Sequence, residues 1–180
     1  MVEDSFTAFL VGSFVSLITI INPPATLPIF TSVTGNLDAD ATRRTATSAS
    51  IYCFCILVGS LFAGSLIMKA FGISYGAMRV AGGMIVARTA WQLLNSRVQE
   101  KSPRSQLAET YTAEQARSQA FYPLTFPISC GPGSIAAAIT VGAALFDPKW
   151  SVLLARMTGA VAANFLTGLT VYLVYRNARR

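Results

Sequence analysis

The sequence has no histidine and few charged residues, which make up 12% of its 180 residues, about half of the roughly 25% typical of soluble domains. All eight acidic residues lie outside the long apolar runs. Serine–histidine pairs, aspartate dyads and metal boxes need side chains that these runs lack, so we expect no enzyme, no bound metal and no cofactor. The absence of a carboxylate within the apolar runs also argues against a proton-driven pump.

Cysteine is scarce, and the three cysteines are poorly placed for a shared site. Cys53 and Cys55 are two residues apart in a helical pattern, so they point to different faces, and Cys130 stands alone. We expect all three to be small apolar filler.

Long apolar runs without any charge are present instead. Residues 5–37 and 45–68 carry no charged side chain. An apolar run of about 18 or more residues predicts a membrane span. We therefore expect an all-α membrane protein whose surroundings are the lipid bilayer, with five spans at residues 6–34, 46–70, 73–94, 120–146 and 150–175.

The basic residues predict the orientation of these spans. Lys69 and Lys149 fall on one side of the predicted membrane, and nine basic residues fall on the other. Because positive loops stay in the cytoplasm, the N-terminus is expected outside and the C-terminus of this chain inside. This bias explains the net charge of +6 without a nucleic-acid partner. The nine are Arg43, Arg44, Arg97, Lys101, Arg104, Arg117, Arg176, Arg179 and Arg180.

Two spans are interrupted by proline and glycine near their middle. The interruptions are Asn22–Pro28 and Phe126–Gly133, at a constant offset of 104 residues that pairs Pro23 with Pro127. Proline removes a backbone donor and clashes with the preceding turn, so each stretch should break its helix. Paired breaks in matching halves point to a transporter binding site built from discontinuous helices.

The offset also predicts an internal repeat. Residues 1–95 form a first unit of three spans, residues 96–119 a cytoplasmic linker with a short amphipathic helix over 112–119, and residues 120–180 a second unit. Three is an odd number, so the two units should be inverted relative to each other. The third span of the second unit would fall beyond residue 180. We expect a chain that stops before its sixth span, rather than a repeat that naturally lacks one.

The breaks supply backbone groups and a few small polar side chains for a substrate site. Freed amides at a helix start favour a carboxylate, and freed carbonyls favour an ammonium or a cation, so a zwitterionic amino acid suits both. Glycines allow close approach to the backbone. The alternative is that the prolines and glycines only kink the helices for packing. The candidate residues are Asn22, Pro23, Thr26, Thr125, Ser129, Gly131 and Gly133.

Three arginines lie within predicted spans. Arg79 shares a helical face with Gly83 and Ala87, and small faces pack against other helices, so it should point into the bundle. It is either a carboxylate clamp in the substrate site or a brace for the broken helices. Arg88 and Arg156 are expected to extend to the nearer membrane surface.

Three motifs carry a resemblance to a known family. They are N-P-x-x-x-x-P-x-F at residues 22–30, F-G-I-S…R-x-A-G-G at 71–83, and P-x-x-x-P-x-x-x-G-P-G-x-I at 123–135. In combination they resemble the MarC family of multi-pass bacterial inner-membrane proteins, over essentially the whole chain. The resemblance implies six spans and a relation to SnatA-like proteins, which move small neutral amino acids such as glycine and alanine.

These features together predict an inner-membrane transporter or exporter of a small neutral solute, and a small amino acid fits best. Alternating access around the two broken helices is the expected mechanism. A coupling ion and the oligomeric state are left open by the sequence. The alternative is a membrane protein with a structural or assembly role and no transported substrate.

Overall fold

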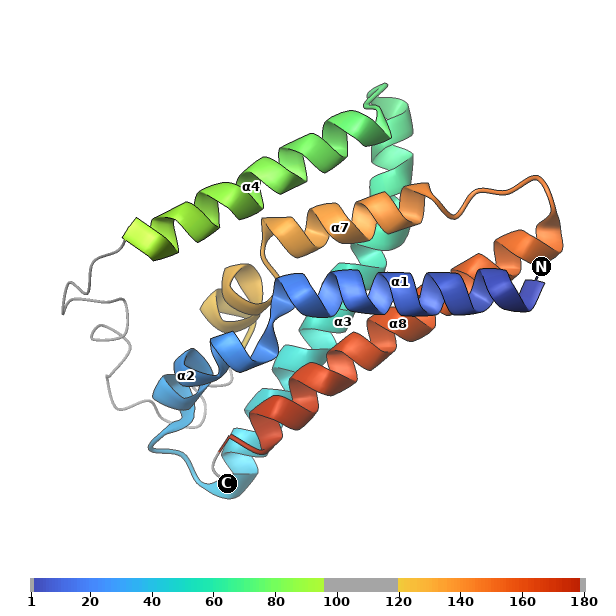
Figure 1. Ribbon diagram of the computed structural model, residues 1–180. Coiled ribbons are helices and arrows are strands. Elements are labelled where there is room, and N and C mark those ends of the chain that lie inside the picture. The colour runs from blue at the N-terminus through green and yellow to red at the C-terminus, as the bar shows by residue number, and fades with distance from the viewer. Residues whose placement is uncertain (1, 96–119, 179–180) are drawn as a thin grey trace.

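The computed structural model describes residues 2–95 and 120–178, and those residues form helices joined by short connections, with no strand among them (Figure 1). The predicted linker 96–119 and its amphipathic helix lie outside the described residues. The elements are α1 (Val2–Ile21), α2 (Pro23–Thr34), α3 (Ala39–Ala70), α4 (Tyr75–Asn95), η1 (Ala120–Ser129), α7 (Pro132–Ala143) and α8 (Trp150–Arg176).

Several of these helices can cross a membrane, which confirms the all-α membrane class. Helices α1, α3 and α8 are each long and apolar enough, and η1 with α7 forms a fourth candidate bent by 70°. Helix α4 has the length but is not in this group, because Arg79, Arg88 and three glycines dilute its apolar residues. The count of five spans therefore stays a prediction.

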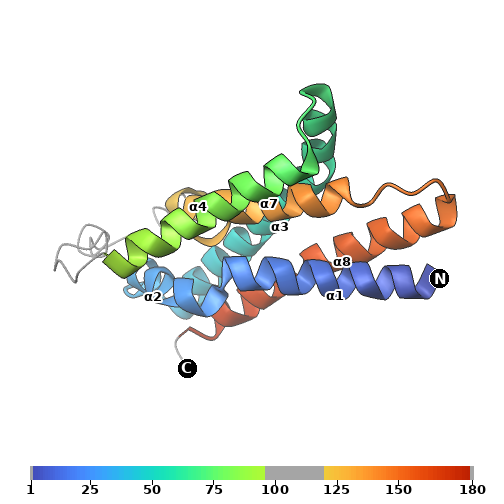
Figure 2. The same cartoon turned by 45° about the horizontal axis from the view of Figure 1, so that its top comes forward.

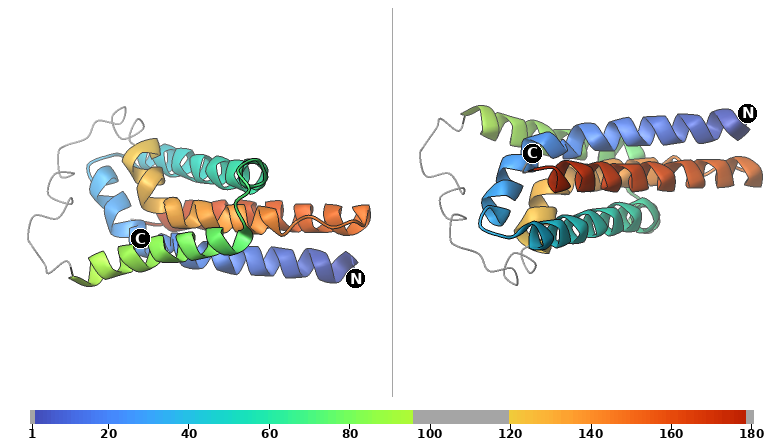
Figure 3. Two further views of the ribbon diagram at one scale, coloured as in Figure 1. Left: turned by 90° about the horizontal axis from the view of Figure 1, so that it is seen from above. Right: turned by 90° about the horizontal axis from the view of Figure 1, so that it is seen from below.

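The helices are arranged in three layers. Helices α7 and α8 lie between α3 on one side and α1 with α4 on the other (Figure 3). Helices α1 and α8 run side by side in the same direction (Figures 1 and 2). Glycine makes this approach close, since a Cβ atom on Gly159 would lie 2.6 Å from the carbonyl oxygen of Phe6. The middle layer thus contains α7, the second half of one broken helix, and its helix α8 packs against α1, the first half of the other.

The first break is where the sequence places it. Helix α1 ends at Ile21, and α2 begins at Pro23, with proline in its first positions. Asn22 between them has a φ of 43°, in the left-handed region that asparagine tolerates better than most residues. This residue interrupts the helix between α1 and α2, and α2 continues away from the N-terminus (Figure 1).

The second break also lies within its predicted stretch. Helix α7 begins at Pro132 after Gly131, and η1 before it contains two residues with extended backbone, Tyr122 and Phe126. The second half-helices α2 and α7 therefore begin 109 residues apart, at Pro23 and Pro132. The predicted offset of 104 is five residues off at these starts, because Pro127 lies inside η1 and does not begin a helix.

The ends of α3 explain its length. Asp38 caps its start, where the side-chain carboxylate accepts a 2.7 Å hydrogen bond from the amide of Ala41. The helix thus begins seven residues before the predicted span at 46. At the other end Gly72, with a φ of 65°, turns the chain into α4.

Candidate functional site

A buried tyrosine on α8 joins the two breaks. The hydroxyl of Tyr175 lies 2.8 Å from the Oγ1 of Thr26 in α2 and 2.5 Å from the Oγ of Ser129 in η1. The Tyr175 ring is fully buried and stacks on the ring of Phe30, with centroids 4.3 Å apart and planes 10° from parallel. Thr26 and Ser129, both nominated from the sequence, are therefore brought together through a residue that the sequence did not nominate.

The same hydroxyl groups also satisfy backbone carbonyls beside the breaks. Thr26 donates to the carbonyl of Pro23 at 3.0 Å, and Ser129 donates to that of Leu124 at 2.8 Å. Thr26, Ser129 and Tyr175 carry one hydroxyl hydrogen each, yet they make four such contacts. Three hydrogens cannot make four hydrogen bonds, so one of the four contacts has no hydrogen between its two oxygens. That contact costs less free energy to break than a hydrogen bond.

The other predicted residues of the breaks have different surroundings. Thr125 is turned to α3, where its Oγ1 lies 3.3 Å from the carbonyl oxygen of Ala49. The same Oγ1 lies 2.6 Å from the carbonyl oxygen of Ala120 in its own element η1. Asn22 is exposed and its side chain caps no helix amide, whereas Pro23 is buried. A Cβ atom on Gly131 would lie 2.8 Å from the carbonyl oxygen of Pro127, so this close approach requires glycine. The structure thus places Thr125 against α3, Asn22 on the surface and Gly131 against the backbone of η1.

A groove of about 630 Å³ opens between α1, α4 and α7. It extends from Ile20 in the last turn of α1 and Gly133 in the first turn of α7 to Phe9 and Ala144. Its walls are mostly glycine, alanine and small hydroxyl side chains. Among the described residues, the lining is Ala8, Phe9, Gly12, Ser13, Ser16, Ile20, Met78, Gly83, Gly133, Ala136, Ala137, Thr140, Val141 and Ala144.

The two helix ends at this groove carry opposite partial charge. The C-terminal end of α1 leaves carbonyl oxygens without helix partners, which favours a cation. At the N-terminal end of α7, Pro132 has no amide hydrogen, and the amides of Ser134 and Ile135 donate to the carbonyl of Gly131. The amide of Gly133 is therefore the group that this end offers to an anion. At the start of α2, Pro23 and Pro24 have no amide hydrogen to offer.

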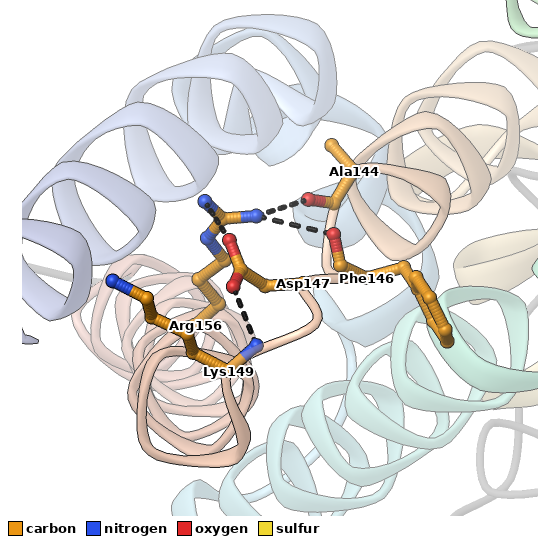
Figure 4. A network of polar contacts seen from close by, with 5 residues as sticks. All are labelled: Ala144, Phe146, Asp147, Lys149 and Arg156. Carbon is orange, nitrogen blue, oxygen red and sulfur yellow. Dashed lines mark hydrogen bonds and ion pairs between the residues drawn. The ribbon is translucent and has the colours of Figure 1, made fainter.

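A second polar cluster, shown in Figure 4, contacts Phe9 and Ala144, which line the groove at the end farthest from Ile20 and Gly133. Arg156 of α8 pairs with Asp147 at 2.9 Å and donates to the carbonyl oxygens of Ala144 and Phe146 at 3.5 and 3.3 Å. Its guanidinium also lies over the ring of Phe9 in α1, 5.4 Å from the centroid. That Arg156 extends toward the nearer membrane surface stays a prediction; its partners are a carboxylate and carbonyl oxygens in the connection between α7 and α8.

Similarity to known proteins agrees with this architecture. The family described as "MarC family integral membrane protein" matches residues 7–179. The chain belongs to the MarC family. It is 34% identical over 158 residues to the "UPF0056 inner membrane protein MarC" of Citrobacter koseri, which covers 84% of this chain and 71% of that protein. The protein of that name from Salmonella typhimurium is 32% identical over the same shares. No solved structure matches.

Membership of the MarC family and the apolar helices make this an inner-membrane protein. Of the residues nominated from the sequence, Gly133 lines the groove, while Thr26 and Ser129 meet at Tyr175. Arg79 belongs to α4, and its side chain lies outside the described part of the structure; Arg88 is exposed.

Tyr175 is the residue of this MarC-family site that sequence reasoning missed. A tyrosine at the end of a predicted span is also typical of the aromatic belt at a membrane surface, which gives no reason to place it inside. Tyr172 and Tyr175 lie three residues apart, which makes them neighbours on one helical face, so the sequence carries no signal that separates them.

Proposed function

We propose that this MarC-family protein moves a small neutral solute across the inner membrane, and that the solute is a small neutral amino acid. The observation that carries the proposal is the meeting of the two breaks at the Tyr175 hydroxyl. On the other side of each break, the last turn of α1 and the first turn of α7 line a groove. Broken helices that meet next to a cavity are typical of transporter sites.

The chemistry of the groove favours a zwitterion. The carbonyl end of α1 suits an ammonium group, and the amide of Gly133 at the start of α7 suits a carboxylate. Between them the walls carry mostly small side chains, with the hydroxyl groups of Ser13, Ser16 and Thr140. A volume of about 630 Å³ accommodates an amino acid with its water, and none of the lining residues that the structure describes is charged.

Both ends of the proposed pathway have a polar closure on α8. The Tyr175 cluster is at one end and the Arg156 cluster at the other, nineteen residues apart, or roughly 28 Å at about 1.5 Å per residue. That distance is close to the ~30 Å of a bilayer core. Alternating access then amounts to opening one cluster while the other stays formed.

The proposal includes the finer fold: five spans of a six-span protein, in two inverted units with the N-terminus outside. Support for the repeat comes from α2 and α7, which both contain 12 residues and both start with proline, 109 residues apart. The same shift of 109 carries α3 close to the position of α8. Support for the orientation remains the distribution of basic residues.

A structural or assembly role is the second candidate, and the lining of the groove is the observation in its favour. Small residues such as Gly12, Gly133 and Ala137 resemble the faces at which membrane helices pack closely. In that case another helix, and no solute, would fill the groove.

A binding panel tests the proposal. Purified full-length protein in detergent is heated with each of a set of amino acids, and the midpoint of unfolding is recorded. We expect glycine, alanine or serine to raise the midpoint in a saturable way, while lysine and glutamate do not. If no neutral amino acid shifts the midpoint of well-folded protein, the assembly role is favoured.

A further inference from the structure

A second groove lies on a different face of the molecule, between α3 and α8. Its volume is about 460 Å³, and it is near the start of α3 and the end of α8. It shares no residue with the groove between α1, α4 and α7. Its lining is Arg43, Thr47, Ser50, Ile51, Phe54, Phe165, Gly168, Leu169 and Tyr172.

Two guanidinium groups converge on one tyrosine at the polar end of this groove. The Nε of Arg43 donates to the hydroxyl of Tyr172 at 3.3 Å, and the guanidinium of Arg176 lies 5.9 Å from the centroid of the Tyr172 ring. Neither guanidinium forms an ion pair with a carboxylate within residues 2–95 and 120–178. Asp40, one turn before Arg43, acts on it only through longer-range attraction. Two exposed cations are thus held near each other with free donors.

The rest of the groove is apolar. Phe54 and Phe165 make an edge-to-face contact at 6.3 Å that forms its floor, and Phe165 is 59% exposed. Gly168 leaves space between the helices, since a Cβ atom there would lie 3.5 Å from the Cβ of Phe54. Ile51 and Leu169 are also exposed on this side. In a membrane such a crevice faces the acyl chains of one leaflet.

We propose that this groove binds an anionic phospholipid, with the phosphate at Arg43 and Arg176 and one acyl chain along the crevice between α3 and α8. Arginine pairs with phosphate oxygens through two parallel hydrogen bonds. Basic pockets between membrane helices at the level of the lipid headgroups are typical of sites for anionic lipids. The apolar floor argues for a lipid over a free phosphate ion, and the site is independent of any transported solute.

Native mass spectrometry of the full chain in detergent tests the site with dioleoyl phosphatidylglycerol and, as the uncharged comparison, dioleoyl phosphatidylcholine. The wild type should retain phosphatidylglycerol with at least tenfold higher affinity. The double substitution Arg43→Gln and Arg176→Gln should remove that preference. Arg44→Gln is the matched control, because Arg44 is next to Arg43 and exposed but does not line the groove.

A second variant keeps the result interpretable if the double substitution folds poorly. Phe165→Ala leaves both arginines in place and removes part of the apolar floor, so it should weaken phosphatidylglycerol binding severalfold. An added arm with inorganic phosphate identifies an ion site: tight phosphate binding that is insensitive to Phe165→Ala would overturn the proposal. So would equal binding of the two lipids, an equal loss in Arg44→Gln, or a mass showing that a second copy covers the groove.

Discussion

At the scale of single residues, the account depends on polar groups at the two ends of α8. Tyr175 contacts both breaks, and Arg156 holds the carbonyls at the end of α7. Both residues compensate for backbone groups or hydroxyl groups that the apolar surroundings would otherwise leave unpaired. Each is therefore open to a test by removal of a single functional group.

Tyr175→Phe removes the shared hydroxyl and keeps the ring that stacks on Phe30. We expect the two breaks to separate more often, because a buried hydrogen-bond partner worth about 1–2 kcal/mol is lost. The buried thiol of Cys130, next to Ser129, reports this opening. In a background with Cys53→Ala and Cys55→Ala, its reaction with a membrane-permeant maleimide should become about 5–30-fold faster, the factor equivalent to that energy.

Tyr172→Phe is the control for this comparison. Tyr172 is three residues away on α8 and bonds to Arg43, not to either break. Its loss should leave the labelling rate of Cys130 unchanged. Equal labelling of wild type and Tyr175→Phe would show that the hydroxyl of Tyr175 does not hold the breaks together.

Arg156→Met removes the donor that bonds to Ala144 and Phe146 as well as the ion pair with Asp147. Asp147→Asn removes only the negative charge. Since both side chains are about one fifth exposed, 24% and 21%, we expect the ion pair to contribute less than about 1 kcal/mol. The midpoint of thermal unfolding should therefore fall more for Arg156→Met than for Asp147→Asn, with Lys149→Gln as a neutral control. Equal losses would mean that the carbonyl contacts contribute nothing.

At the scale of helices, close approach is set by glycine. A Cβ atom on Gly142 of α7 would lie 1.8 Å from the carbonyl oxygen of Leu61 in α3, which no side-chain adjustment relieves. Gly59, by contrast, has nothing within 4 Å of an added Cβ atom. Gly142 thus lies on a packed face of α7, and Gly59 lies on an open face of α3.

Gly142→Ala should force α3 and α7 apart and lower the free energy of unfolding by several kcal/mol, roughly 2–5 as for other overpacked or strained core sites. Gly59→Ala should leave stability unchanged or raise it by up to about 1 kcal/mol, because alanine favours the helix. Thermal unfolding of both variants in the same detergent makes the comparison. A stable Gly142→Ala protein would mean that α3 and α7 are not packed as described.

The breaks were predictable from the sequence because proline acts locally. Pro23 and the stretch around Pro132 interrupt their helices whatever surrounds them. The partner of the breaks was not predictable, because the contact between Tyr175 and Thr26 joins residues 149 positions apart and depends on tertiary packing. The partners of Arg156 were not predictable for a related reason: they are a carboxylate and carbonyl oxygens in the connection after α7, which a residue pattern does not display. The offset of 104 matched Pro127 with Pro23 by residue type, whereas α2 and α7 begin at Pro23 and Pro132, 109 residues apart; the repeat itself stays a prediction.

At the scale of the whole molecule, the basic residues predict the orientation in the membrane. In a cysteine-free background, Asn36→Cys places a thiol in the loop between α2 and α3, and Lys149→Cys places one before α8; both positions are exposed. We expect an impermeant thiol reagent added to intact cells to label position 149 and not position 36. The opposite pattern would reverse the orientation.

Transport by reconstituted protein tests the central claim most directly. Proteoliposomes that contain wild type, Ser16→Leu or Thr19→Leu are incubated with radiolabelled glycine and alanine. Ser16 lines the groove and Thr19, one turn away on α1, does not, although both hydroxyl groups bond to their own helix at 2.7 Å. The account predicts saturable uptake by wild type and Thr19→Leu and at least a tenfold loss in Ser16→Leu. Absence of uptake by wild type, or equal uptake by both variants, would contradict it.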